Sequence, residues 1–219
     1  VSGEKVDKAT NDYLNEVLEE FDRTPKKEKK AGDGSDIIIG VKGSGDEADK
    51  YFADKKLDEN LFEQSGGYAL SADGEDIVIL GKDTEAAFYG VATLKMMFSS
   101  FNGEKFYPVE IQDYASIDAR GYIEGFYGSW THEQRKSLME FTRDVKMNLY
   151  VYASKTDAYH TSKWAELYPD DMLNQFKELV KLQEKNKTEF SWAVHIGDML
   201  KGVQPNASVQ YDENKYQES

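Results

Sequence analysis

The stretch "ARGYIEGFYGSWTHEQRKSLMEFTRDVKMNLYVYAS", residues 119–154, decides the fold. It opens with a short apolar run at 119–126, continues through a helical pattern at 131–147, and ends in a second apolar run at 148–154. Short runs rich in aromatic and β-branched residues predict strands, and apolar residues at helical spacing predict a helix between them. A strand, a helix and a strand in this order are typical of a parallel βα unit.

The same alternation continues toward the C-terminus, with a helix predicted at 169–186 and a third strand at 189–196. Strands and helices that alternate in this way fit an open doubly wound sheet or the beginning of a (β/α)8 barrel, and the pattern alone leaves both open. In either case ligands bind where the strands end, because the loops at the carboxyl ends meet over one edge.

The residues before this region predict a different arrangement, a small sheet covered by helices. Its predicted elements are a helix around 14–21, a strand at 36–41, a hairpin of two strands at 67–80, a helix at 82–98 and a strand at 107–114. Asp73 and Gly74 between the two hairpin strands are a strong turn signal. Asp83 or Thr84 can cap the longer helix.

The two halves also differ in composition, since all three tryptophans and all three histidines lie beyond residue 129. We therefore place a boundary near Ile117. Residues 1–116 are expected to form a small N-terminal α+β domain, and residues 117–219 the first βα units of a second, α/β domain.

The composition argues against several classes of partner. The net charge of -14, from 27 basic and 41 acidic residues, repels polyanions and so argues against a nucleic-acid partner. No run approaches the roughly 18 consecutive apolar residues of a membrane span, and the first ten residues have no signal-peptide core. Because the chain has no cysteine, thiol nucleophiles and cysteine-ligated metals are excluded.

Several motifs have ordinary structural explanations. His132 and Glu133 follow Thr131 in what we predict to be a capped first turn of a helix. Asp170 and Asp171 suit the positive end of the next helix dipole rather than a catalytic pair. No G-x-S-x-G, P-loop or dinucleotide glycine fingerprint occurs, and the histidines do not suggest a metal site, so we expect neither a metal nor a cofactor.

Three segments follow the predicted strands of the second half, at 124–130, 152–160 and 194–200. In the first, Gly125 would let the backbone approach a ligand, and Tyr127 with its aromatic neighbours could form an apolar wall. The alternative is that the glycines only permit a turn and the aromatic rings fill the interior.

The second segment carries Lys155, Asp157, Tyr159 and His160, whose donors and acceptors suit sugar hydroxyls or a phosphate. The alternatives are an exposed ion pair between Lys155 and Asp157, or a Schiff-base lysine of an aldolase-like barrel enzyme. Glu124, in contrast, is expected to be a buried and paired structural group rather than an acid catalyst.

Four stretches together resemble one enzyme family. They are "GKDTEAAFYGVATLKMMF" at 81–98, "RGYIEGFYGSWTHEQR" at 120–135, "NLYVYASKTDAYH" at 148–160 and "KWAELYP" at 163–169. In their order and spacing, from about residue 67 to 196, they are similar to the family 84 glycoside hydrolases, the O-GlcNAcase and bacterial hyaluronidase-like β-N-acetylglucosaminidases.

The resemblance implies an N-terminal α/β domain followed by a (β/α)8 catalytic barrel. It also implies removal of β-linked N-acetylglucosamine with retention, in which the 2-acetamido oxygen of the substrate attacks C1 and forms an oxazoline. Substrate-assisted families are exceptions to the usual scheme of two catalytic carboxylates. In this family one aspartate orients the acetamido group and its neighbour is the general acid.

Carried over by position, the resemblance implies that the Gly125 carbonyl faces a sugar hydroxyl and that Lys155 donates to another hydroxyl of the terminal sugar. Asp157 and Tyr127 would support that pocket. The loop at 124–130 is one residue shorter than usual and lacks a proline, and Thr156 and Ala158 stand where Asp and Pro are commoner. The shape of the mouth is therefore expected to differ.

The family's catalytic Asp-Asp pair follows the fourth barrel strand, and this chain stops soon after the third. A usual barrel needs roughly 250 residues, and three strands cannot close one. We therefore expect an incomplete barrel that carries part of the sugar pocket but no catalytic residue, is inactive alone, and has the missing part of the barrel as a partner. The alternative is a non-catalytic homologue that binds glycans. A secreted or cell-surface bacterial location is expected.

Overall fold

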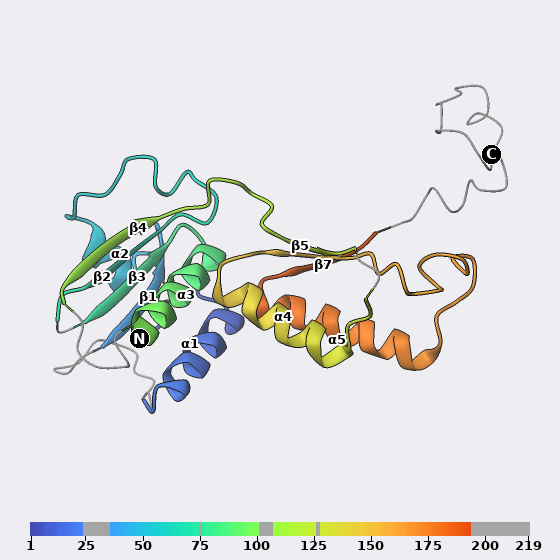
Figure 1. Cartoon of the computed structure of the whole chain (residues 1–219). Coiled ribbons are helices and arrows are strands. Elements are labelled where there is room, and N and C mark those ends of the chain that lie inside the picture. Colours follow the sequence, from blue (N-terminus) through green and yellow to red (C-terminus); the bar gives the residue numbers. More distant parts are fainter. Residues whose placement is uncertain (24–35, 75, 101–106, 126–127, 194–219) are drawn as a thin grey trace, which may run out of the picture.

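The computed structural model describes residues 1–23, 36–74, 76–100, 107–125 and 128–193. Two sheets lie side by side, each with helices packed against it (Figure 1). The first half of the chain forms the four-stranded sheet and the second half forms the three-stranded sheet. None of the helices in these described ranges is long and apolar enough to cross a bilayer.

The four-stranded sheet has the order β1-β3-β2-β4. Its elements in chain order are α1 (Lys8–Glu20), β1 (Ile37–Val41), α2 (Glu47–Phe52), β2 (Tyr68–Ala72), β3 (Ile77–Gly81), α3 (Thr84–Ser100) and β4 (Val109–Asp113). Strand β2 is antiparallel to both β3 and β4, and β1 is parallel to β3. The predicted hairpin, strands and two long helices are confirmed, and the Asp83 carboxylate caps α3 by accepting from Ala86 N at 2.8 Å.

Strands β1, β2 and β3 of the first sheet are buried on both faces, whereas β4 is partly exposed. Ile79 on β3 packs toward α1 and α3, whereas its neighbours Val78 and Leu80 pack toward α2. Burying side chains of this size contributes roughly 1.5 to 3 kcal/mol each. The short helix α2 was not predicted, because six residues are too few for a helical repeat of apolar side chains.

The second half alternates strands and helices as predicted. It contains β5 (Gly121–Glu124), α4 (His132–Asp144), β6 (Leu149–Tyr152), α5 (Asp170–Asn186) and β7 (Glu189–Trp192). The three strands are parallel in the order β5-β6-β7. Thr131 and Gln134 form the capping box that begins α4, and Asp170 and Asp171 lie exposed in the first turn of α5, so both structural explanations are confirmed.

Helices α4 and α5 cover one face of the second sheet (Figure 1). Tyr150 and Tyr152 of β6 are buried there against Met139 and Leu179. The opposite face carries Ile123, which is 58% exposed, and no element of the described ranges covers it. The described part of the second half is therefore a parallel sheet with helices on one side and an open face on the other.

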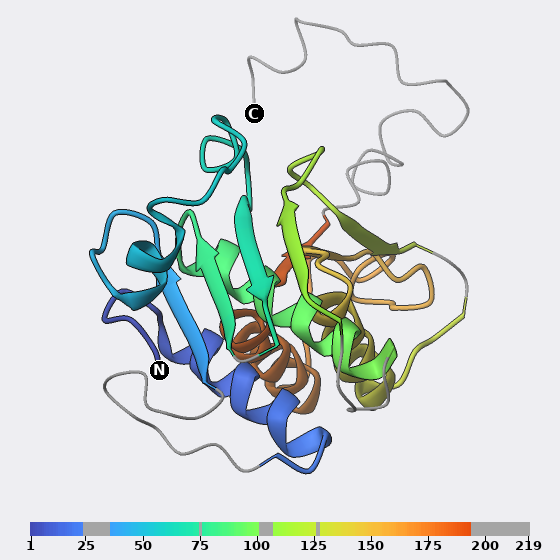
Figure 2. The same cartoon turned by 90° about the vertical axis from the view of Figure 1, so that its left-hand side faces the viewer.

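The two halves contact each other through their helices. Helix α1 lies next to α5, and α3 next to α4, beneath the sheets (Figure 2). The buried Arg143 of α4 makes an ion pair with Glu16 at 2.8 Å and lies 4.3 Å from the centre of the Tyr13 ring. Asp144 accepts from the Tyr13 hydroxyl at 2.9 Å and from Lys95 at 2.7 Å. These contacts join the halves firmly.

Two lysines with left-handed backbone conformation add to this interface. Lys146, with φ of 59°, follows α4 and donates to Asp113 at 2.8 Å and to the Tyr68 hydroxyl at 2.7 Å. Lys187, with φ of 51°, is the C-cap of α5 and forms an ion pair with Asp7 at the start of α1. A left-handed conformation is unfavourable for a residue other than glycine. Each lysine thus adopts this unfavourable conformation at a position where its side chain forms an ion pair with the first half.

Candidate functional site

The residues that we predicted to contact a ligand follow neighbouring strands. Gly125 comes directly after β5, and Lys155 comes three residues after the end of β6. Glu124 and Tyr152, the last residues of these parallel strands, are partners in the register. The predicted segments at 124–130 and 152–160 therefore lie at the same edge of the sheet, as expected. Tyr127 and the third segment, 194–200, lie outside the described residues.

Hydrogen bonds connect the loops at this edge. The Ser129 hydroxyl after β5 lies 2.8 Å from the Thr156 hydroxyl after β6. His160 Nε2 donates to the Ala193 carbonyl at 2.6 Å, directly after β7. The carboxyl ends of all three strands are thus connected across one edge, which is the place where ligands bind in parallel α/β folds.

Gly125 has room for a side chain in its described surroundings. A Cβ built at this position would meet nothing nearer than the Ile123 side chain, at 3.7 Å. Gly121, at the start of the same strand, is different, because a Cβ there would lie 1.9 Å from the Leu149 carbonyl oxygen. The packing of the described chain therefore explains the glycine at 121 and gives no reason for the glycine at 125.

Glu124 points toward the helices and not toward the loops. Its side chain is fully buried and accepts two hydrogen bonds from Arg135 of α4, from Nη2 at 2.7 Å and from Nε at 2.9 Å. The Tyr150 hydroxyl also donates to it. Burial, together with this hydrogen bond, raises the pKa of Tyr150. The prediction that Glu124 is a buried, paired structural group is confirmed.

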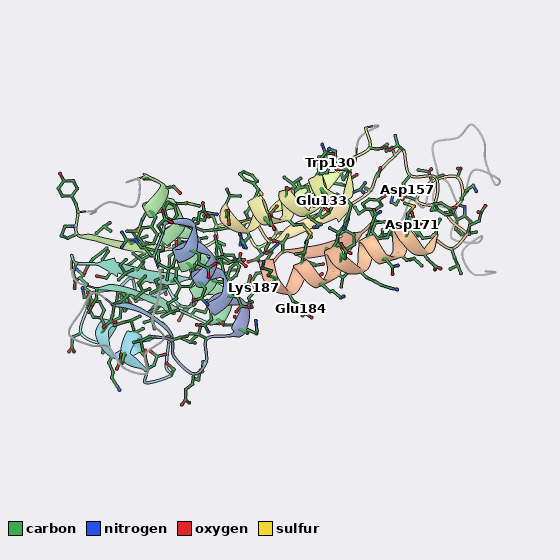
Figure 3. All side chains as sticks on the ribbon, turned by 90° about the horizontal axis from the view of Figure 1, so that it is seen from below. Trp130, Glu133, Asp157, Asp171, Glu184 and Lys187 are labelled. Carbon is green, nitrogen blue, oxygen red and sulfur yellow. The ribbon has the colours of Figure 1, made fainter. Side chains whose placement is uncertain are left out.

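Lys155 is exposed, whereas Asp157, two residues later, is 9% exposed. Asp157 accepts from the hydroxyls of Tyr152 and Tyr168 at 2.7 and 2.8 Å. It lies with Trp130 and Asp171 at the end of the second half that points away from the four-stranded sheet (Figure 3). Within the described chain, Asp157 thus accepts hydrogen bonds from two tyrosine hydroxyls. Sugar contacts by Gly125 and Lys155, and support of the pocket by Asp157, stay predictions.

A shallow groove of about 490 Å³ lies along the outer face of α4. It is lined by Trp130, Glu133, Gln134, Ser137, Leu138 and Phe141. Helix α4 contacts α5 through a different face, which carries the ion pair of His132 with Glu178 at 2.7 Å. Within the described ranges no three histidine or acidic side chains are placed to hold a metal ion.

Three members of this region were not singled out from the sequence. Arg135 pairs with Glu124, Ser129 joins two loops, and Tyr168 binds Asp157. Only Arg135 had a usable signal, because a carboxylate predicted to be buried needs a cationic partner. The other two depend on where a long loop returns to the sheet, and spacing along the chain does not reveal that.

The comparisons with known proteins cover both halves of the chain. Residues 120–217 match the family described as beta-N-acetylglucosaminidase, and residues 1–114 match "Glycosyl hydrolase family 20, domain 2". Protein O-GlcNAcase of Rattus norvegicus is 36% identical over 78 residues, which is 35% of this chain and 8% of that protein.

Two solved structures extend the similarity to most of the described chain. CpGH84D is 36% identical with a TM-score of 0.77, over 87% of this chain and 32% of that one. CpGH84B is 30% identical with a TM-score of 0.69, over 88% of this chain and 33% of that one. The chain therefore spans about a third of these structures and less than a tenth of the curated relative. It belongs to the family 84 glycoside hydrolases and corresponds to their N-terminal region.

Proposed function

We propose that this chain forms one side of the N-acetylglucosamine pocket of a β-N-acetylglucosaminidase. The Gly125 carbonyl accepts from one hydroxyl of the terminal sugar, and Lys155 donates to another. The observation that carries the proposal is the pairing of Glu124 with Tyr152, which brings the segments of Gly125 and Lys155 to one edge of a parallel sheet. The space beside Gly125, which the described packing does not use, supports it.

Hydrolysis proceeds with retention in this proposal, and the substrate's acetamido oxygen is the nucleophile. The aspartate that orients the acetamido group and the general acid come from a part of the enzyme beyond this sheet. Glu124 is unsuited to either role, because both of its oxygens bind Arg135. Lys155 is unsuited to Schiff-base chemistry, because it is exposed and a nucleophilic lysine needs desolvation.

The domain division and the barrel are part of the same proposal. Residues 1–116 form the N-terminal domain, and residues 117–219 begin a (β/α)8 barrel. Three observations support a barrel. The face of the second sheet at Ile123 is uncovered, β5 is the outermost strand of that sheet in the described ranges, and a groove lies along the outer face of α4. A further βα unit would pair with β5 and place its helix in that groove. A secreted or cell-surface location stays a prediction.

The test uses hydrolysis of 4-nitrophenyl N-acetyl-β-D-glucosaminide. The pure 219-residue chain should not release 4-nitrophenol, whereas the complete polypeptide that contains it should. In that polypeptide Lys155→Ala should raise KM about tenfold or more, as expected for loss of a hydrogen bond from a charged donor. Lys163→Ala is the matched control, because Lys163 lies in the same loop, where it pairs with Glu166 at the surface and lies over the Tyr159 ring.

Each result decides between functions. Turnover by the 219-residue chain alone would contradict the assignment of the catalytic pair to another part of the enzyme. Binding of N-acetylglucosamine by the complete polypeptide without any turnover would favour a non-catalytic glycan-binding module. If Lys155→Ala and Lys163→Ala behave alike, the pocket is in the wrong place.

A further inference from the structure

Asp157 lies between the exposed Lys155 and the buried core of the second half. Both of its carboxylate oxygens bind groups of the protein: Oδ2 accepts from the hydroxyls of Tyr152 and Tyr168, and Oδ1 accepts from the backbone N–H of Tyr159 at 2.9 Å. Three donors at 2.7 to 2.9 Å satisfy a carboxylate that is 9% exposed.

The two hydroxyl donors come from the two ends of the loop between β6 and α5. Tyr152 is the last residue of β6, and Tyr168 lies two residues before α5. The rings of both tyrosines pack edge-on against Phe176 of α5, with centres 5.0 and 5.1 Å apart. Trp192 of β7 donates its indole N–H to the Tyr168 hydroxyl at 3.3 Å. Asp157 therefore joins the beginning and the end of the loop that carries Lys155.

The same network reaches the end of β5. The guanidinium of Arg135 lies 5.1 Å from the centre of the Tyr152 ring while it pairs with Glu124. Glu124 directly precedes Gly125. Burial, and then the hydrogen bond to Asp157, raises the pKa of both Tyr152 and Tyr168, so their hydroxyls stay protonated donors at neutral pH. Asp157, Tyr152, Arg135 and Glu124 thus form one connected set of side chains, which lies next to the loops of both Gly125 and Lys155.

We propose that Asp157 is a positioning residue, which holds the loop so that Lys155 faces the sugar, and that it does not contact the sugar itself. This inference rests on the proposed pocket and specifies how Asp157 supports it, through Lys155 and not by contact with the sugar. A carboxylate that turned to a sugar hydroxyl would leave the buried hydroxyl of Tyr152 and the half-buried hydroxyl of Tyr168 without their acceptor, which disfavours such a turn.

A double-mutant cycle in the complete polypeptide tests this role, with hydrolysis of 4-nitrophenyl N-acetyl-β-D-glucosaminide as the measurement. Asp157→Ala should raise KM about tenfold when Lys155 is present and less than about twofold in the Lys155→Ala background. Equal effects in both backgrounds would show that Asp157 acts without Lys155, and the inference would be wrong. A Lys155→Ala variant with unchanged KM would instead overturn the proposed pocket, so the two failures are distinguishable.

Hydrogen exchange on the 219-residue chain provides a second measurement that needs no activity. Asp157→Ala should speed exchange of the backbone amides at 153–161 about tenfold or more and leave those of α3 unchanged. Tyr168→Phe removes one hydroxyl and keeps the ring, so it should speed the same amides by a smaller factor even if Asp157→Ala does not fold. Unchanged exchange at 153–161 in Tyr168→Phe would contradict the positioning role.

Discussion

Arg135 and Glu124 form a two-pronged ion pair between α4 and the end of β5, with N–O distances of 2.7 and 2.9 Å and with the glutamate fully buried. Removing one member of a buried pair leaves an uncompensated charge, which typically costs about 3 to 5 kcal/mol. Arg135→Ala should therefore lower the free energy of unfolding by that amount in urea. Lys136→Ala, on the same helix but at the surface, should change it far less, because Lys136 pairs only weakly with the exposed Glu133. Similar values for the two variants would contradict the role of the pair.

Substitution of the glycine that begins β5 should affect stability, whereas substitution of the glycine that follows β5 should affect sugar binding. Gly121→Ala should destabilise the fold, because its Cβ would collide with the Leu149 carbonyl oxygen. Gly125→Ala should unfold at the same urea concentration as the parent chain, since its Cβ has room. In the complete polypeptide Gly125→Ala should nevertheless raise KM for the aryl glycoside. A Gly125→Ala variant with normal stability and normal KM would show that no sugar approaches this position.

Because one face of the second sheet is uncovered, Ile123→Lys should affect folding differently in the 219-residue chain and in the complete polypeptide. Ile123→Lys should leave the stability of the 219-residue chain nearly unchanged and improve its solubility, because the side chain is 58% exposed there. In the complete polypeptide the same lysine would be buried inside the proposed barrel and should prevent folding. Thermal unfolding of both forms measures the difference. Normal unfolding of the complete Ile123→Lys protein would argue against a barrel.

Acid should weaken the interface between the halves. Burial alone would raise the pKa of Asp144, but the hydrogen bond from Lys95 and the charge of Arg143 outweigh it and lower the pKa below 3.8. A carboxyl group with a lowered folded pKa contributes stability that is present above its unfolded pKa and is lost as the pH falls through the folded pKa.

The free energy of unfolding should therefore decrease below about pH 4, and Asp144→Asn should decrease less steeply over that range. Urea unfolding at several pH values measures the slope. Glu140→Gln is the control, because Glu140 lies exposed on the same helix. An unchanged slope in Asp144→Asn would mean that other carboxyl groups determine the acid sensitivity.

Most of the fold follows from local patterns in the sequence. The parallel strands of the second half were predicted because strand-like and helical periods alternate there, and the hairpin was predicted because Asp73 and Gly74 separate two apolar runs. Helix α2 was missed, since its six residues are too few to show a helical repeat, although Asp46 caps it by accepting from Asp49 N at 2.9 Å. The parallel pairing of β1 with β3 has no local signal, because β1 precedes β2 along the chain and β3 follows it, although β1 and β3 are neighbours in the sheet.

The candidate site was harder to predict than the fold. Strand ends indicated where Gly125 and Lys155 lie, because parallel strands bring their carboxyl ends to one edge. The direction in which each side chain points could not be predicted in the same way. Asp157 looked like a partner of Lys155 along the chain, yet it binds Tyr168, eleven residues later. Such a contact depends on the path of the whole loop, and no single spacing in the sequence encodes that path.

The contacts of Lys146 and Lys187 with the first half lie where the helices end, at the opposite edge of the second sheet from Gly125 and Lys155. The proposed sugar contacts and the attachment to the first half therefore involve different residues. A hybrid protein that takes residues 1–116 from a relative with Asp7, Tyr68 and Asp113 at the same contact positions should therefore keep the proposed sugar contacts of the second half unchanged.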